Sequence, residues 1–361
     1  MDKTTTALET PLREQLDRLA AFEPTEYPVL SLYLDMKTDQ EGRRTHRDAF
    51  LRKVLPERMQ AFEGKARKSV ERDVERIHSQ IAGEARSSAA ALAIFACSAK
   101  DDFFEAIQLD TPIDRHQLFI QSTPHLYPLA RVNDQSPRYA ALVMDTNSAR
   151  LYVFGLGTEQ TRQQITNPKT RRHSMGGWSQ ARYQRHVENF HLRHTKEVIG
   201  ELDRIVREER INQIVVSCED VARPVLMEHL PRHLAEKVID VRLSAKTPDH
   251  QIMTDTLEAI RRKDAVTDAE HVEAMLGAWR GNGLAVVGPE ATLDALIKGQ
   301  VEELLIAARP DLLKTSDGKR DQLAGELVTK AQQNAARIRF IENPDLMQDV
   351  GGVGALLRFR I

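Results

Sequence analysis

Positively charged residues gather beside a pair of glycines in one short part of the chain. Between Lys169 and Lys196 there are seven Lys and Arg residues and one acid, a charge of +6 in 28 residues. The pair Gly176-Gly177 lets the backbone approach a ligand closely, and the amides at a helix N-terminus favour anions. This combination is typical of a surface that binds a phosphate backbone, with an affinity that falls as salt rises.

The residues expected to contact nucleic acid in this window are basic, aromatic or hydroxyl-bearing: Arg171, Arg172, Trp178, Ser179, Arg182, Tyr183 and Arg185. The arginines would neutralise phosphates, and Trp178 and Tyr183 offer flat rings on which exposed RNA bases stack. A solvated helix face is the plainer interpretation of the same charges. The glycine tip beside them is what favours an RNA-binding surface.

The sequence supports a metal site less well than an RNA-binding surface. Four of the twelve histidines lie in or near this window, at positions 173, 186, 191 and 194. No His-Glu-x-x-His arrangement occurs, and an RNA-facing helix explains these histidines better than a metal site. Asp145, at the end of a predicted strand, would be the first metal ligand of a nuclease, but a nuclease normally needs several converging carboxylates. We expect no metal and no cofactor.

Two further classes of chemistry are disfavoured. Cys97 and Cys218 each lie in an apolar strand, where cysteines are usually packing residues and not nucleophiles. No Gly-x-x-x-x-Gly-Lys run occurs, so the chain is not itself a P-loop NTPase.

One long helix must position the basic window. Residues 179–209 contain no proline and only one glycine, which predicts a continuous helix. The segments before and after it have strand character: a hairpin over 139–154, a buried strand over 211–217 and another strand over 237–243. Strand, helix and strand in succession predict a layered, largely parallel sheet.

The flanking regions are also mixed α/β. Before the hairpin we expect helices over 11–23 and 46–86, the second broken near Pro56 and Gly64, and strands over 29–34, 91–98, 103–109 and 117–121. After the middle region we expect helices over 250–280, 289–299 and 321–336, and strands over 284–287, 301–307, 337–341 and 355–360. The predicted domains are residues 1–136, 137–268 and 269–361.

Composition sets the broad class. The chain has 361 residues, 41% of them hydrophobic and 29% charged, as in a soluble globular protein of two or three domains. No apolar run reaches the length of a membrane helix, and the N-terminus lacks the apolar core of a signal peptide. We therefore expect a cytoplasmic protein without a membrane partner. Because the net charge is only −2, nucleic-acid binding must come from a local patch.

Three stretches resemble the archaeo-eukaryotic class-I peptide chain release factors, the group that includes Pelota. Residues 176–185, Gly-Gly-Trp-Ser-Gln-Ala-Arg-Tyr-Gln-Arg, are similar to the family's Gly-Gly-Gln loop and the helix start that follows it. Residues 287–306 resemble its Gly-x-(x)-Glu-x-Leu-x-Ala-Leu…Gly-x-Val-Glu-x-Leu pattern, and residues 351–359 its closing Gly-Gly-Ile-Gly-Gly-Ile-Leu-Arg-Tyr. The stretches occur in the family's order and span about residues 137–361.

The resemblance implies an α/β fold of three domains. The middle domain would be an RNase H-like layered sheet, and the C-terminal domain an αβα sandwich similar to kink-turn-binding ribosomal proteins. It also implies that the C-terminal domain contacts a translational GTPase; a packed interface to the middle domain is the alternative use of the same helices.

The loop departs from the family at its third position, where Trp178 replaces the glutamine. In the family this glutamine helps to position water at the peptidyl-tRNA ester in the peptidyl-transferase centre. Gln180 lies two residues further on. By resemblance, the candidate catalytic residues are therefore Gly176, Gly177 and Gln180, and the chain is an enzyme, a peptidyl-tRNA hydrolase, if Gln180 serves as the family glutamine.

The N-terminal region also departs from the family. Residues 1–136 contain no Asn-Ile-Lys-Ser and no Tyr-x-Cys-x-x-x-Phe, the codon-reading motifs, and the first asparagine of the chain is Asn133. Any release activity is therefore expected to be independent of the codon.

These features lead to a ribosome-associated factor that contacts rRNA and peptidyl-tRNA. It would dock in the A site and hydrolyse peptidyl-tRNA in release or rescue. The first alternative is a non-catalytic hibernation or rescue factor that blocks the A site. The second is a metal-dependent nuclease on the RNase H-like core, with Asp145 as a ligand.

Overall fold

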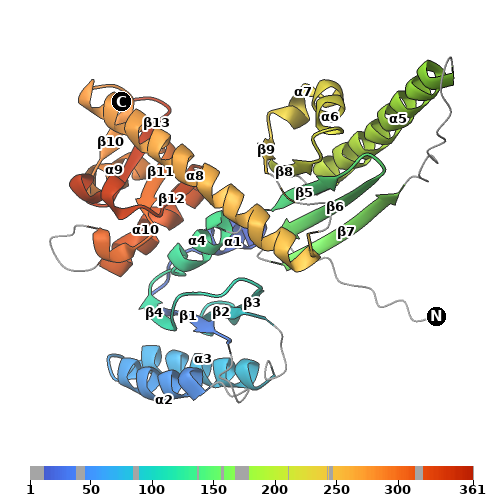
Figure 1. Ribbon diagram of the computed structural model, residues 1–361. Coiled ribbons are helices and arrows are strands. Elements are labelled where there is room, and N and C mark those ends of the chain that lie inside the picture. Colours follow the sequence, from blue (N-terminus) through green and yellow to red (C-terminus); the bar gives the residue numbers. More distant parts are fainter. Residues whose placement is uncertain are drawn as a thin grey trace. The chain divides into compact units, whose positions relative to one another are not determined.

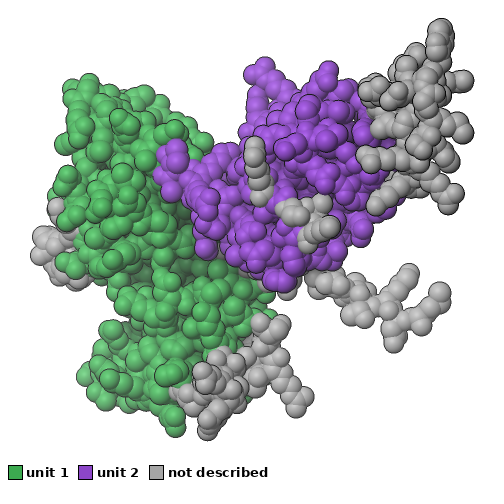
Figure 2. Space-filling view, viewed as in Figure 1, with its two compact units in different colours: residues 1–136, 267–361 green, residues 137–266 purple. Residues whose placement is uncertain are grey.

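A computed structural model describes residues 12–37, 45–83, 89–135, 138–155, 158–166, 179–209, 211–241, 243, 247–313 and 320–360. The chain divides into two compact units (Figure 2): residues 1–136 with 267–361 form unit 1, and residues 137–266 form unit 2. Unit 1 contains two β-sheets and unit 2 contains one. Within the described ranges, no helix combines the length and the apolar character that crossing a membrane requires.

The N-terminal part of unit 1 is an antiparallel sheet with helices packed on it (Figure 1). Its elements are α1 (Leu12–Ala20), β1 (Val29–Asp35), α2 (Thr45–Met59), α3 (Gly64–Gly83), β2 (Ala91–Cys97), β3 (Phe103–Leu109), β4 (Gln117–Gln121) and α4 (Tyr127–Gln135). The strand order is β3-β2-β1-β4. Alternate residues of β1 share a face, and Leu30, Leu32 and Leu34 pack with apolar residues of α2 and α3.

Two features of this part differ from the sequence prediction. Helix α2 is not broken at Pro56 but continues to Met59, and the break falls just before Gly64. Pro56 is tolerated because it stands in the last turn, where removing one N–H costs a single hydrogen bond next to carbonyls that are already free. Helix α4 was not predicted; Pro128 stands near its start, where proline is favoured.

The C-terminal part of unit 1 has a mixed sheet buried on both faces. Its elements are the last part of α8 (Asp249–Arg280), β10 (Ala285–Val287), α9 (Pro289–Ile297), β11 (Val301–Ala307), α10 (Arg320–Gln333), β12 (Arg337–Ile341) and β13 (Val353–Leu357), with 3₁₀ turns at Pro310–Leu312, Pro344–Leu346 and Gln348–Val350. The strand order is β10-β13-β11-β12, and only β11 and β12 are parallel. Neighbouring residues of β11 point to opposite faces, yet Leu304 and Leu305 are both fully buried. Helices therefore cover both sides, as in an αβα sandwich.

Helix α4 joins the two parts of unit 1. The Tyr127 hydroxyl donates to the carbonyl of Ala307, at 2.5 Å. The Asp134 carboxylate accepts from the backbone N–H of Phe340, at 2.9 Å. Helix α10 also packs against α1 and α4. The N-terminal and C-terminal segments of the chain thus share one packed unit.

His125 packs closely against Gly325 of α10 in this joint. The backbone of His125 is held on the first sheet, where Ser31 Oγ accepts from its N–H and its carbonyl accepts from the Tyr33 hydroxyl, at 3.0 and 2.6 Å. A Cβ added to Gly325 would lie 2.4 Å from His125 Nδ1, well inside contact distance. Any side chain larger than hydrogen at position 325 would therefore clash with the ring of His125.

Replacement of Gly325 by alanine is expected to destabilise unit 1 by about 2 kcal/mol, the typical cost of overpacking. A helical Gly→Ala change normally stabilises by up to about 1 kcal/mol. Gly277 in α8 is the matched control, because its added Cβ would meet no atom within 4 Å. Thermal denaturation followed by circular dichroism should show opposite shifts for the two variants; a raised midpoint for Gly325→Ala would contradict this packing.

Unit 2 is a five-stranded sheet with helices on both faces. Its elements are β5 (Tyr139–Met144), β6 (Ser148–Gly155), β7 (Thr158–Thr166), α5 (Ser179–Glu208), β8 (Gln213–Cys218), α6 (Arg223–His229), α7 (Arg232–Ala235), β9 (Val238–Asp240) and the first part of α8. The order is β7-β6-β5-β8-β9; the first three strands are antiparallel, and β5, β8 and β9 are parallel. One face packs on α5 and α6 and the other on α8.

These sheets confirm the predicted α/β class, with an RNase H-like order in unit 2 and an αβα arrangement at the C-terminal end. Each of the three ranges predicted as domains carries one sheet, and the division into three domains stays a prediction. Strand β7 was not predicted, because its residues Thr-Glu-Gln-Thr-Arg-Gln-Gln-Ile-Thr are almost all polar, as an edge strand allows. The last strand begins at Val353, not Ala355.

Candidate nucleic-acid interface

Helix α5 carries the basic window and is anchored by its second half. It runs unbroken for 30 residues, as the sequence predicts. Val198, Leu202 and Ile205 recur at helical spacing and are buried against the sheet. The half of the helix that follows residue 194 is therefore fixed by hydrophobic packing.

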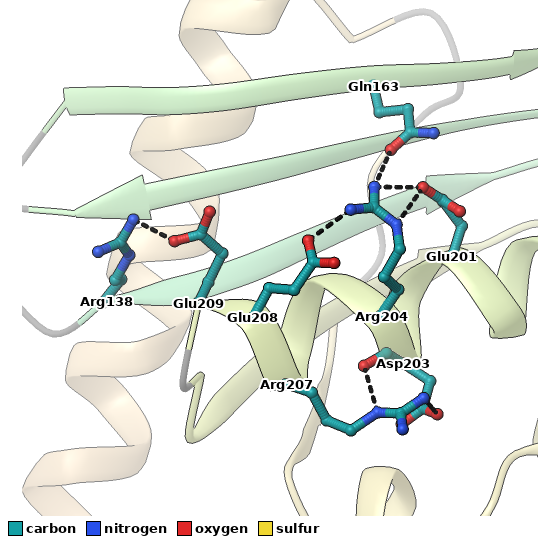
Figure 3. A network of polar contacts seen from close by, with 8 residues as sticks. All are labelled: Arg138, Gln163, Glu201, Asp203, Arg204, Arg207, Glu208 and Glu209. Carbon is teal, nitrogen blue, oxygen red and sulfur yellow. Dashed lines mark hydrogen bonds and ion pairs between the residues drawn. The ribbon is translucent and has the colours of Figure 1, made fainter. Parts of the chain in front are cut away.

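The anchored half of α5 pairs its own charges (Figure 3). Arg204 forms ion pairs with Glu201 and Glu208, and Arg207 pairs with Asp203 at 2.6 Å. Residues 197–209 contain two arginines and five acids, so this half is acidic. The charge of the helix changes sign near residue 197, and the basic half stands next to the glycine pair in sequence.

Four basic positions of the other half lie along one side of the helix. At 3.6 residues per turn, positions Arg182, Arg185, Arg193 and Lys196 fall within an arc of about 80°. The buried positions, such as Val198, lie on the opposite side. The side chains of Arg193 and Lys196 are exposed and form no ion pair with any residue that the structure describes. We call these four positions the basic stripe.

The predicted site residues fall into two groups. Arg171, Arg172, Gly176, Gly177 and Trp178 lie outside the described residues. The backbone of Ser179, Gln180, Arg182, Tyr183 and Arg185 forms the start of α5. Sequence reasoning did not single out Arg193 and Lys196 as contacts; their spacing of three residues, repeated from Arg182 and Arg185, was the available signal.

Gln180 is the second residue of α5, so its backbone belongs to the first helical turn. By helical periodicity it lies about 160° around the axis from Arg182. The candidate catalytic position is therefore on the other side of the helix from the basic stripe.

His194 does not face solvent, contrary to the prediction of an RNA-facing histidine. Its residue is 1% exposed, and its ring bonds to the backbone of Ser148 in the β5–β6 turn. Burial lowers the pKa of His194, and this hydrogen bond offsets the effect in part. His194 is thus a neutral packing group that ties α5 to the hairpin.

Asp145 is used by the same turn. Its carboxylate accepts hydrogen bonds from the backbone N–H groups of Asn147 and Ser148, at 2.7 and 2.6 Å, and from the Ser148 hydroxyl at 2.8 Å. Burial raises the pKa of Asp145, but these hydrogen bonds outweigh it and the pKa is lowered. The carboxylate is a turn-forming group whose oxygens are already bonded.

Neither metal binding nor thiol chemistry finds a site in the described part of the chain. No group of three or more His, Cys, Asp or Glu side chains converges there on a point that could hold a metal ion. Burial, with a smaller effect from Glu219, raises the pKa of Cys218 to about 12, and burial also raises that of Cys97. Both thiols are therefore protonated at neutral pH and unreactive.

Comparison with known proteins matches these features to one group. Residues 124–261 match the family model "Bacterial archaeo-eukaryotic release factor family 10". Peptide chain release factor subunit 1 of Methanopyrus kandleri is 28% identical over 213 residues, 56% of this chain and 51% of that protein. The Aeropyrum pernix protein of the same name is 25% identical over 214 residues, 53% of this chain and 52% of its own length. The chain spans about half the length of the curated relatives it matches.

Solved structures give weaker similarities. The archaeal translation termination factor aRF1 aligns over 96% of this chain and 97% of its own, with 16% identity and a TM-score of 0.28. Dom34 of S. cerevisiae aligns over 75% and 80%, with 11% identity and a TM-score of 0.42. A ribosome-bound archaeal Pelota aligns over 97% and 94%, with 13% identity and a TM-score of 0.43.

The family model and both sequence relatives point to the same class, the release factors. Residues 124–261 are similar to the bacterial archaeo-eukaryotic release factor family 10. The predicted resemblance is thereby confirmed, while the Gly-Gly-Trp-Ser-Gln variant of the loop stays a prediction.

Proposed function

We propose that this release-factor-like protein docks in the ribosomal A site through the basic stripe and hydrolyses peptidyl-tRNA independently of the codon, in release or rescue. The observation that carries the proposal is the change of charge along α5. Its anchored half neutralises its own arginines, whereas Arg193 and Lys196 stay exposed and unpaired within the described residues. A stripe of basic positions on one side of a helix fits the regular phosphates of rRNA. The names of the two sequence relatives support this direction.

Reversing the charge of Arg182 and Arg185 to glutamate is expected to weaken cosedimentation with 70S ribosomes at least tenfold, because two phosphate contacts become repulsive. The matched control is Arg204→Glu with Arg207→Glu, on the same helix. It changes the net charge equally. It removes exposed ion pairs, each worth less than about 1 kcal/mol, and a hydrogen bond to Gln163, and it adds repulsion from the acids of this half by a similar amount per pair. Binding of the wild type should also fall as salt rises. Equal binding of the two double variants would show that the stripe is only a solvated face.

A second candidate is a non-catalytic hibernation or rescue factor that blocks the A site. One specific observation favours it: Gln180 belongs to the first turn of α5 and not to the loop before it. A residue fixed in the helix has a restricted reach. The two residues that separate Gln180 from position 178, where the family has its glutamine, span at most about 7 Å even when extended. The C-terminal part of unit 1 is proposed to contact a translational GTPase in either case.

The nuclease alternative is not supported at Asp145, its first candidate metal ligand, because this carboxylate already accepts hydrogen bonds within the β5–β6 turn. We do not propose it.

A further inference from the structure

A cavity of about 460 Å³ lies within unit 1, between strand β4, helix α4 and the segment 308–311. This volume is in the range of small-molecule sites. Three aromatic residues line it, Phe119, His125 and Tyr127. The rings of Phe119 and His125 are stacked, with centroids 3.7 Å apart and planes inclined by 24°. The cavity therefore has a flat aromatic wall.

This wall carries no charge at neutral pH. His125 is 2% exposed, and burial lowers its pKa to about 3. The contact with Gly325 fixes the edge of the ring that carries Nδ1, and this atom has no hydrogen-bond partner among the residues the structure describes. A neutral aromatic surface of this kind suits a flat ligand that can stack on it.

The positive and negative charges around the cavity are equal in number. Three arginines and three aspartates line it: Arg115, Arg131, Arg309, Asp114, Asp311 and Asp321. Arg131 pairs with Asp114 at 2.6 Å, and Arg309 pairs with Asp311 at 2.7 Å. A ligand of either net charge would gain from one set of groups and be repelled by the other. The lining thus selects neither a phosphate nor an amine.

Hydrogen-bonding capacity remains at the cavity. Arg131 Nε is buried and has no partner among the described residues, although the same guanidinium also reaches Glu342 at 3.5 Å. The amides of Gln117 and Gln135 line the cavity as well, and each offers both donors and an acceptor. Because Arg131 Nε itself is inaccessible, a ligand in the cavity would be bound by the exposed part of the Arg131 guanidinium and by these amides, which can donate to acceptors on its edge.

We propose that this cavity binds a nucleobase, which is planar, uncharged and rich in donors and acceptors along its edge. The base would stack on the partly exposed ring of Phe119, which His125 supports from behind, and accept a hydrogen bond from Arg131. It could come from a free nucleoside or from an unstacked base of an RNA chain. The proposal goes beyond ribosome docking and does not depend on it, because the basic stripe belongs to unit 2 and the cavity to unit 1.

Isothermal titration of the full chain with adenosine, guanosine, cytidine and uridine tests the free form, and single-stranded hexanucleotides of each base test the RNA form. We expect at least one nucleoside or hexanucleotide to bind with 1:1 stoichiometry and a Kd below about 1 mM. A nucleoside that binds as well as its hexanucleotide indicates the free form, and a hexanucleotide that binds alone indicates the RNA form.

Arg131→Lys keeps the positive charge but removes the planar guanidinium, and it should weaken that binding about tenfold, as expected for one lost hydrogen bond. Arg337→Lys is the control, since Arg337 forms an exposed pair with Glu302 away from the cavity lining. If Arg131→Lys fails to fold, Gln117→Ala with Gln135→Ala provides the second test. Absence of all binding overturns the proposal, and so does binding that neither cavity variant weakens while Arg182→Glu with Arg185→Glu abolishes it.

Discussion

Replacement of Gln180 by alanine is expected to lower peptidyl-tRNA hydrolysis on the ribosome by about a hundredfold, because a group that positions the attacking water typically contributes that much. Cosedimentation with 70S ribosomes should not change, since position 180 lies on the other side of α5 from the basic stripe. The measurement is release of labelled peptide from ribosomes with an empty A site, at saturating concentrations of the factor.

Gln184→Ala is the matched control for this experiment. Gln184 follows Gln180 by one helical turn on nearly the same side of α5, so it tests for a general effect of shortening a glutamine there. Equal loss in both variants would argue against a specific role of Gln180. If the wild type releases no peptide but protects the A site from other ligands, the non-catalytic candidate replaces the hydrolase.

Acidification is expected to destabilise unit 1 through His125. Burial lowers the pKa of His125 to about 3 in the folded protein, against an ordinary value of 6.5. Between these two values the unfolded chain binds a proton that the folded chain does not. The stabilisation is therefore complete above pH 6.5 and is lost as the pH falls towards 3, by up to about 1.4 kcal/mol per pH unit and about 5 kcal/mol in all.

Urea denaturation at pH 7, 6 and 5 measures this slope, followed by circular dichroism. Burial also lowers the pKa of His116 and His194, so the informative quantity is the difference between variants. His125→Gln cannot titrate and should show a clearly smaller slope than the wild type. His78→Gln, at an exposed position on α3, is the control for replacing a histidine by glutamine in unit 1. A slope unchanged in His125→Gln would mean that position 125 is not buried as described.

The elements that the sequence predicted well are those with a long or strong pattern. Helix α5 was recognisable because its 30 residues contain no proline and a single glycine, and β8 because a run of apolar residues is typical of a buried strand. Helix α4 and strand β7 were missed; β7 is polar, so that its edge position, which is a tertiary property, decides its structure.

The candidate site was predictable in part for the same reason. The basic window is a local feature of sequence, whereas the burial of His194 depends on the hairpin turn at Ser148. The packing of the N-terminal part of unit 1 against its C-terminal part could not be predicted from the sequence. His125 and Gly325 stand two hundred residues apart, and neither residue type alone indicates a partner.

The joint made by α4 also determines when unit 1 can be completed during synthesis. The Tyr127 hydroxyl bonds to the carbonyl of Ala307, 180 residues later in the chain. At ordinary elongation rates, this partner emerges roughly 10–40 s after α4. During that interval the apolar faces of α1 and α4, including Leu16 and Leu129, have no C-terminal strands or helix to cover them. The nascent chain thus exposes an apolar surface throughout this interval. The N-terminal part of unit 1 is therefore the region that a chaperone acting at the tunnel exit would protect.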